Sequence, residues 1–183
     1  MRTFITLEFD KKTKEEIIEI QKMIRENSYS GRFKYIDNFH LTLKFLGETD
    51  LITIDMINDE LNKKLKGFKC FKLNFSGIGA FGVGRTTRTI YLKVKNPLDR
   101  INHLFNIVDE ATALYGFKLE NKYVPHVTIA QDVELKIPFN EIADKSESLF
   151  NKEIFFDKLV IMKSEQKSGK RIYSPLKTIL FDK

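Results

Sequence analysis

The chain has 183 residues, of which 42% are hydrophobic and 31% are charged, and its formal net charge is +6. This composition fits a globular protein with a sizeable core, and the excess of lysine and arginine favours a polyanionic partner such as nucleic acid. The single cysteine, Cys70, excludes an internal disulfide, and no apolar run approaches the roughly 18 residues of a membrane span. We expect no signal peptide, no membrane contact and a cytoplasmic monomer.

In chain order, alternating polar and apolar residues predict strands, and apolar spacings of three and four predict helices. The first strand covers residues 3–9, and the first helix covers 14–27 with Thr13 as its N-cap. The later predicted strands are 32–36, 39–47, 68–77, 87–96, 117–124, 126–131, 153–165 and 172–181, and the later helices are 50–67, 97–116 and 139–151. Because strands often come in adjacent pairs, we predict an α+β fold with two antiparallel sheets flanked by helices.

A glycine-rich stretch, SGIGAFGVGR, has the spacing of a dinucleotide-binding loop at Gly77, Gly79 and Gly82. Such a loop requires a helix to begin at the glycines, so that its first amides face the pyrophosphate. The residues that follow are β-branched and typical of a strand. We therefore interpret the glycines as a turn between two strands.

Two short motifs, His40-Leu-Thr42-Leu and His126-Val-Thr128-Ile, lie 86 residues apart. The same offset places Arg2-Thr3 on Arg88-Thr89 and Arg85 on Arg171, and the order of predicted elements repeats in the two halves. We infer an internal duplication, giving a single bilobal domain with pseudo-twofold-related lobes at about 1–86 and 87–183. The two motifs then face each other across a central cleft.

The motif residues suit phosphodiester chemistry. Alternation along a strand puts the histidine and threonine of each motif on the same face. Two imidazoles can serve together as general base and general acid near neutral pH. The hydroxyls of Thr42 and Thr128 can donate hydrogen bonds to the non-bridging oxygens of a phosphate. This arrangement needs no metal or other cofactor, and the symmetry leaves open which histidine is the acid.

At these residues the sequence resembles the two-histidine phosphoesterases, and within them the RNA 2′,3′-cyclic phosphodiesterases, also called 2′-5′ RNA ligases. FHLTLKFLGE and YVPHVTIAQ are similar to the two motif blocks, and GIGAFG is similar to the glycine-phenylalanine loop of the family. The resemblance implies hydrolysis of a terminal 2′,3′-cyclic phosphate on RNA, including tRNA fragments, to a 2′-phosphate. It also implies that His40 is the proton donor and His126 the proton acceptor, with 2′-5′ ligation as the reverse reaction.

One position departs from the family pattern. Gln131 stands five residues after the second histidine, where the family often has an arginine. Lys44, predicted on the His40 face of its strand, is a candidate replacement, and Arg85 and Arg171 are candidates at the cleft edge. Phe81 is a candidate for stacking on a base, whereas alternation places Phe45 in the core.

Two alternatives remain open. Gln131 is compatible with a phosphoesterase or ligase that acts on 2′-5′-linked or small cyclic nucleotides. A non-catalytic RNA-binding protein on the same scaffold is less consistent with the sequence, because a protein that only binds RNA does not need two titrating histidines.

Overall fold

The computed structural model describes residues 1–95 and 97–183; Asn96, the last residue of the strand predicted over 87–96, lies outside the described residues. The strands are β1 (Arg2–Glu8), β2 (Ser28–Phe33), β3 (His40–Glu48), β4 (Phe71–Phe81), β5 (Thr87–Lys95), β6 (His126–Leu135), β7 (Asn151–Phe156), β8 (Lys158–Lys167) and β9 (Lys170–Leu180). The helices are α1 (Lys11–Glu26), α2 (Leu51–Lys64), α3 (Asp99–Ala113) and α4 (Phe139–Leu149), with a 3-10 turn at Ile36–Asn38.

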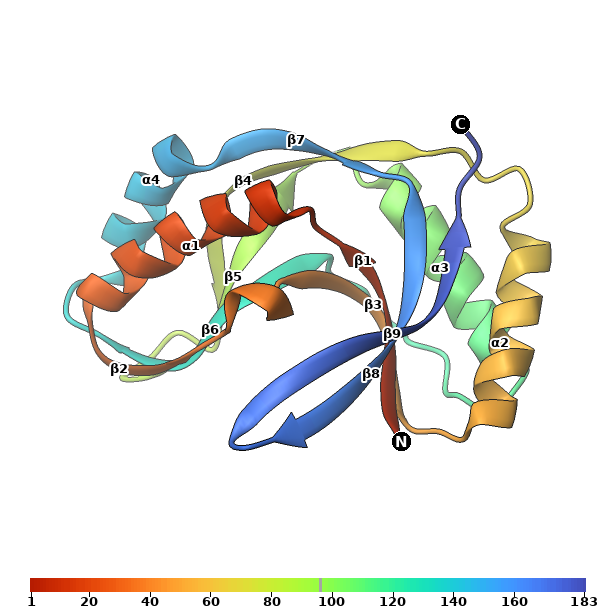
Figure 1. Cartoon of the computed structure of the whole chain (residues 1–183). Helices are drawn as coiled ribbons and strands as arrows, with labels where there is room; N and C mark the ends of the chain where they lie inside the picture. Colours follow the sequence, from red (N-terminus) through yellow and green to blue (C-terminus); the bar gives the residue numbers. More distant parts are fainter. Residues whose placement is uncertain (96) are drawn as a thin grey trace.

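The strands form two sheets, and every pair of neighbouring strands is antiparallel. The first sheet has the order β3-β1-β8-β9, and the second has the order β2-β6-β5-β4-β7. In Figure 1 the β8–β9 hairpin projects away from the body of the molecule. The predicted α+β class with two antiparallel sheets is confirmed.

Each sheet takes strands from both halves of the chain. In the first sheet β1 pairs with β8, and in the second sheet β2 pairs with β6 and β4 pairs with β5. The predicted lobe boundary near residue 86 therefore falls between β4 and β5, which are hydrogen-bonded neighbours. The two sheets consequently do not coincide with segments 1–86 and 87–183. The internal duplication stays a prediction. In the first sheet β8 and β9 come from the second half of the chain, and in the second sheet β2 and β4 come from the first half.

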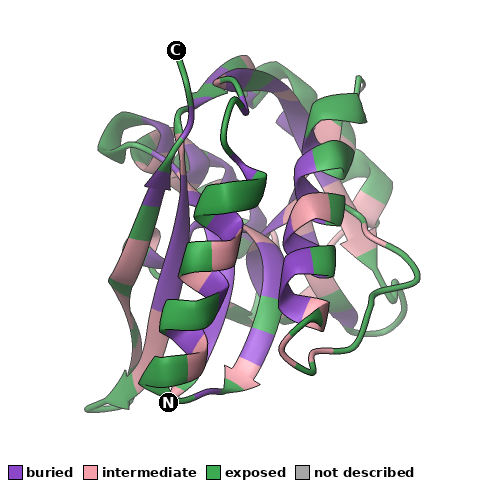
Figure 2. Cartoon of the chain, turned by 90° about the vertical axis from the view of Figure 1, so that its right-hand side faces the viewer, coloured by how far each residue is buried: buried purple, intermediate pink, exposed green. Residues whose placement is uncertain are grey.

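The helices cover the outer faces in two pairs, α1 with α4 and α2 with α3 (Figure 1). Helix α1 is capped by Asp10, whose carboxylate accepts a 2.6 Å hydrogen bond from the amide of Thr13, so Thr13 is not the N-cap. Ile17, Ile20 and Ile24 recur at helical spacing and are fully buried. Figure 2 shows the same division on α2 and α3, with buried faces turned inward and exposed faces outward.

The segment predicted as one strand over 153–165 is divided at Asp157 into β7 and β8, which belong to different sheets. Three further predicted elements differ from the structure. Residues 117–124 form no strand, and the segment before the first motif is a strand over Ser28–Phe33 instead of 32–36. The third difference concerns the glycines, because β4 continues to Phe81 and therefore includes Gly77 and Gly79. Gly77, at φ 60°, accompanies a bulge against β5, and Gly79 packs under Tyr91. Of the three, only Gly82 lies in the turn.

No helix among residues 1–95 and 97–183 is long and apolar enough to cross a membrane.

Candidate active site

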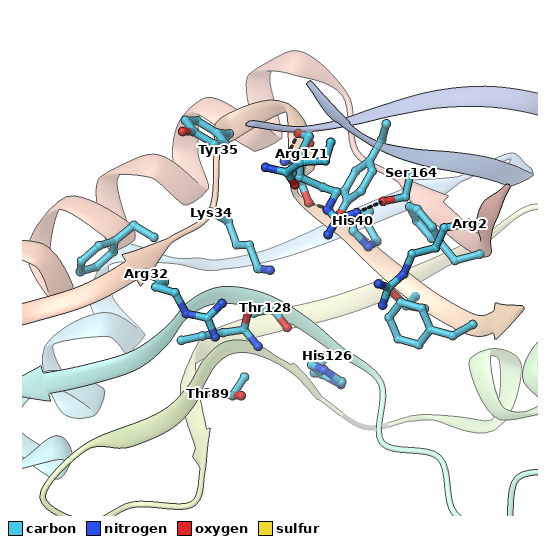
Figure 3. Close-up of a pocket in the computed structure, with 18 of the residues that line it drawn as sticks. Arg2, Arg32, Lys34, Tyr35, His40, Thr89, His126, Thr128, Ser164 and Arg171 are labelled. Carbon is cyan, nitrogen blue, oxygen red and sulfur yellow. Dashed lines mark hydrogen bonds between the residues drawn. The ribbon is translucent and has the colours of Figure 1, made fainter. Parts of the chain in front are cut away.

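A cleft of about 1140 Å³ opens between the two sheets. One wall comes from β1, β3 and the β8–β9 hairpin, and the other from β2, β5, β6 and the end of β4. His40 and Thr42 line the first wall, and His126 and Thr128 line the second. Figure 3 shows the two histidines approaching from opposite sides. The structure therefore brings the four motif residues to one site.

The two imidazoles are oriented by the same local contact. Nδ1 of His40 lies 2.7 Å from the carbonyl oxygen of Asn38, and Nδ1 of His126 lies 2.8 Å from that of Val124. A carbonyl oxygen can only accept, so each Nδ1 carries the hydrogen. In the neutral ring, Nε2 then holds the lone pair and is the atom available for proton transfer.

Aromatic rings hold both imidazoles in place. The His40 ring centroid lies 4.8 Å from that of Phe4 and 5.1 Å from that of Tyr173. The His126 ring makes edge contacts with Phe81 and Tyr91, each at 5.4 Å. These contacts restrict the side-chain rotation of each histidine and leave the ring edge facing the cleft.

The surroundings of His40 disfavour the protonated form of its imidazole. Burial is the main cause that lowers the pKa of His40 to about 4, and the nearby charges of Lys34, Lys14 and His126 add to the effect. The hydrogen bond to Asn38 acts in the opposite direction. His40 is therefore neutral at pH 7 while the cleft is empty.

The threonine hydroxyls are available to a ligand. Thr42 and Thr128 are half-buried and line the cleft. Within the described part of the chain, neither Oγ1 atom has a hydrogen-bond partner. Both can therefore donate to a bound anion.

Three of the other predicted contacts lie in the cleft. Phe81, Gln131 and Arg171 all line it. Phe81 stacks on Tyr91 with ring centroids 4.4 Å apart, and the guanidinium of Arg171 lies 3.4 Å from the hydroxyl of Ser164. Arg85 instead lines a separate, open hollow beside residues 135–140. It is not among the residues that line the cleft with the two motifs.

The prediction for Lys44 was wrong, and a β-bulge explains why. Ile5 pairs with Lys44 but Thr6 pairs with Thr42, so β3 carries one extra residue at Leu43 and the alternation of its faces shifts. Lys44 turns inward and forms a 2.5 Å ion pair with Asp109, and its side chain is 3% exposed. Phe45 correspondingly turns outward and lines the cleft, contrary to its predicted core position.

Sequence reasoning did not assign most of the cations in the cleft. The lining contains Arg2, Arg32, Lys34, Arg88 and Arg171, and no aspartate or glutamate of the described residues lines it. The repeat offset already pairs Arg2 with Arg88, and the alternation of Arg32 with Lys34 places those two on one strand face. Five cations without a lining carboxylate indicate an anionic ligand. Within residues 1–95 and 97–183, no group of three or more His, Cys, Asp or Glu side chains is placed to hold a metal ion.

The fold of this chain is found in solved structures. LigT from E. coli, solved in complex with 3′-AMP, superposes with a TM-score of 0.82 over 100% of this chain and 98% of that chain, at 22% identity. TT0787 from Thermus thermophilus superposes with a TM-score of 0.79 over 99% of this chain and 98% of that chain, at 21% identity. At this level of identity the likeness defines the fold as that of LigT.

The sequence comparison identifies the family. The model of the 2′-5′ RNA ligase superfamily matches residues 9–168, and the chain belongs to that superfamily. An RNA 2′,3′-cyclic phosphodiesterase from Thermotoga maritima is 33% identical over 131 residues, which are 72% of this chain and 70% of the relative. Another from Archaeoglobus fulgidus is 30% identical over 146 residues, covering 79% and 78% of the two chains.

Proposed function

We propose that this protein is an RNA 2′,3′-cyclic phosphodiesterase that hydrolyses a terminal 2′,3′-cyclic phosphate to a 2′-phosphate. The observation that carries the proposal is the pair of histidines on opposite cleft walls, each with Nδ1 at a carbonyl oxygen. The two Nε2 atoms are then free to transfer protons to and from the oxygens on opposite sides of one phosphorus atom. In-line displacement at phosphorus needs such a pair, because the attacking and leaving oxygens lie opposite each other.

In the proposed reaction, Nε2 of His126 accepts a proton from water as the water oxygen bonds to phosphorus. The bond between phosphorus and the 3′ oxygen breaks, and Nε2 of His40 donates a proton to that oxygen. The products are a 2′-phosphate and a free 3′-hydroxyl. His126 ends protonated and His40 neutral, so one proton exchange with solvent restores the starting state.

His40 must therefore be protonated when substrate is bound, although burial and neighbouring cations hold its pKa low in the empty cleft. A phosphodiester carries a negative charge, which favours the imidazolium and opposes the effect of Lys34. We infer that His40 takes up its proton together with the substrate. The neighbouring hydroxyls of Thr42 and Thr128 donate to the non-bridging oxygens and stabilise the transition state.

The proposal includes the setting of the reaction. The ligand is an RNA end that carries a cyclic phosphate, tRNA fragments included, and the protein acts as a monomer in the cytoplasm without a metal ion. Ligation of RNA ends through a 2′-5′ linkage is the same chemistry run backwards, with a ribose hydroxyl in place of water.

The experiment is hydrolysis of a short RNA that ends in a 2′,3′-cyclic phosphate, in the presence of EDTA. The wild-type protein is compared with His40→Ala, His126→Ala and the control His103→Ala, whose imidazole lies on the exposed face of α3. We expect turnover by the wild type and the control, and a loss of about 10²–10⁴-fold in both motif variants.

The alternatives are separate outcomes of the same assay. Turnover of 2′-5′-linked dinucleotides or small cyclic nucleotides, with none of RNA ends, would assign the chemistry to a different substrate. Salt-dependent RNA binding without turnover of any of them would leave a binding protein.

A further inference from the structure

Strand β2 runs beside the second motif strand and adds two cations to it. Arg32 pairs in register with Gln131, and Phe33 pairs with Ala130. The ladder extends beyond β2, where the amide of Lys34 donates a 3.0 Å hydrogen bond to the carbonyl of Ile129. Arg32 and Lys34 both line the cleft, and Figure 3 shows their side chains extending towards Thr128.

Arg32 is held in position by Asp132. Its Nε donates a 2.8 Å hydrogen bond to Oδ2 of Asp132, and its Nη2 contacts the same oxygen. Asp132 has φ 50°, a left-handed conformation that few residues other than glycine adopt. A shift in the β2–β6 register accompanies it, as Ser30 pairs with Glu134 but Arg32 with Gln131. The bulge thus turns the carboxylate to the guanidinium, whose remaining N–H groups stay available to a ligand.

Lys34 has no carboxylate partner among the described residues. Burial lowers its pKa, and the charges of Arg32 and Arg171 lower it further. The same ammonium contributes to the low pKa of His40, so it lies close to the first motif as well. A partly buried lysine among like charges is unfavourable in an empty cleft, and an anion between the two motifs would relieve that repulsion.

We propose that Arg32 and Lys34 of the β2 segment bind the terminal phosphate, with Arg32 placed beside Gln131 of the second motif strand. Arg32 donates to non-bridging oxygens beside Thr128, and Lys34 balances the negative charge between the motifs. Asp132 is a positioning residue that acts through Arg32. The proposal rests on the proposed function for the identity of the phosphate ester, but its binding arm can be tested without turnover.

The first test measures the Kd of inorganic phosphate and of a dinucleotide with a 2′-phosphate by calorimetry. The variants are Arg32→Gln and Lys34→Gln, and the matched control is Arg85→Gln, which loses the same charge outside the cleft. We expect roughly ten- to a hundredfold weaker binding in the two cleft variants, since each loses a charge-assisted contact, and an unchanged Kd in the control. We also expect KM for the cyclic substrate to rise in Arg32→Gln and Lys34→Gln and to stay unchanged in Arg85→Gln.

The second test moves the cation. Arg32→Gln combined with Gln131→Arg restores the guanidinium to the neighbouring strand, and we expect most of the lost phosphate affinity to return. Asp132→Asn keeps a residue that tolerates the left-handed backbone but removes the anchoring charge. It weakens phosphate binding several-fold in the wild type and has no further effect in the Arg32→Gln background, whereas a purely structural role would lower the melting temperature equally in both.

The outcomes separate the two proposals. Wild-type phosphate affinity in both Arg32→Gln and Lys34→Gln would overturn the assignment of these cations, whatever the turnover assay gives. If phosphate binding is lost in these variants but the wild-type protein hydrolyses no cyclic phosphate, the cation site stands and the proposed reaction fails.

Discussion

The hydroxyl of Tyr123 donates a 3.1 Å hydrogen bond to the backbone carbonyl oxygen of Thr42. The Tyr123 ring stacks on Phe105 of α3 with centroids 4.2 Å apart, and burial raises the pKa of its hydroxyl. Tyr123 precedes His126 by three residues, so this contact joins the approach to the second motif directly to the first motif strand. This hydrogen bond from a neutral side chain is therefore one of the contacts that connect the two motifs.

Tyr123→Phe keeps the stacked ring and removes only the hydroxyl. We expect a loss of about 1 kcal/mol in the free energy of unfolding, the typical worth of a buried hydrogen bond, together with a fall in kcat as the two motifs lose their fixed separation. Urea unfolding and steady-state kinetics measure the two effects. Tyr29→Phe, at a side chain that is 72% exposed, is the control. Unchanged kcat in a destabilised Tyr123→Phe would show that the contact serves stability alone.

Stability should depend on pH through His40. An unfolded histidine titrates near pH 6.5, whereas the folded protein holds the pKa of His40 at about 4. On acidification the unfolded state takes up the proton first, so the contribution of His40 is full above pH 6.5 and falls until pH 4. The total loss is up to about 3 kcal/mol.

Urea unfolding at pH 7.5, 6, 5 and 4 checks this sign and range. His40→Gln should show a shallower decline than the wild type, and His103→Gln should follow the wild type. An equal or steeper decline in His40→Gln would show that His40 is not held neutral in the empty cleft.

Lys44 contributes to stability instead of substrate binding. Its ammonium contacts Asp109 and the carbonyl oxygen of Lys118, the latter at 2.6 Å, and so anchors the segment that leads to the second motif. Lys44→Met leaves the Asp109 carboxylate buried without its cation, and we expect a loss of about 3–5 kcal/mol. The double variant Lys44→Met/Asp109→Leu should recover most of it. A stable Lys44→Met with a raised KM would restore the role that the sequence predicted.

Gly79 provides the space for Tyr91 beside His126. A Cβ atom at position 79 would lie 2.6 Å from the Tyr91 ring. Gly79→Ala therefore displaces a ring that flanks His126, and we expect kcat to fall while phosphate binding at the β2 cations is retained. Gly84→Ala is the matched control, because its nearest neighbour is an atom 4.0 Å away and its backbone is compatible with alanine. Equal kinetics in the two variants would show that Tyr91 does not position the histidine.

The parts of the site that follow local rules were predictable. The apolar alternation around His40 and His126 predicted two motif strands, and each strand puts its histidine and threonine in the cleft. The constant offset of 86 residues between the motifs predicted, from the sequence alone, that they face each other across a cleft. The antiparallel class followed from adjacent strand pairs, because such pairs need only short connections.

The remaining features depend on contacts between distant segments. The bulge at Leu43 exchanges the faces of Lys44 and Phe45. It arises in the pairing of β3 with β1, so the β3 sequence alone does not predict it. The pairing of β8 with β1, and of β4 with β5, is likewise a tertiary feature. Arg32 reaches the site only because β2 pairs with β6, about 100 residues further along the chain. Residues 117–124 have strand-like composition but find no strand partner.

In the proposed reaction, water attacks phosphorus and the 3′ oxygen leaves. A single-turnover reaction of RNA with a 2′,3′-cyclic end, in ¹⁸O-labelled water with EDTA, tests it most directly. We expect one ¹⁸O atom in a 2′-phosphate and a free 3′-hydroxyl. A 3′-phosphate product, or no labelled product from the folded protein, would contradict it.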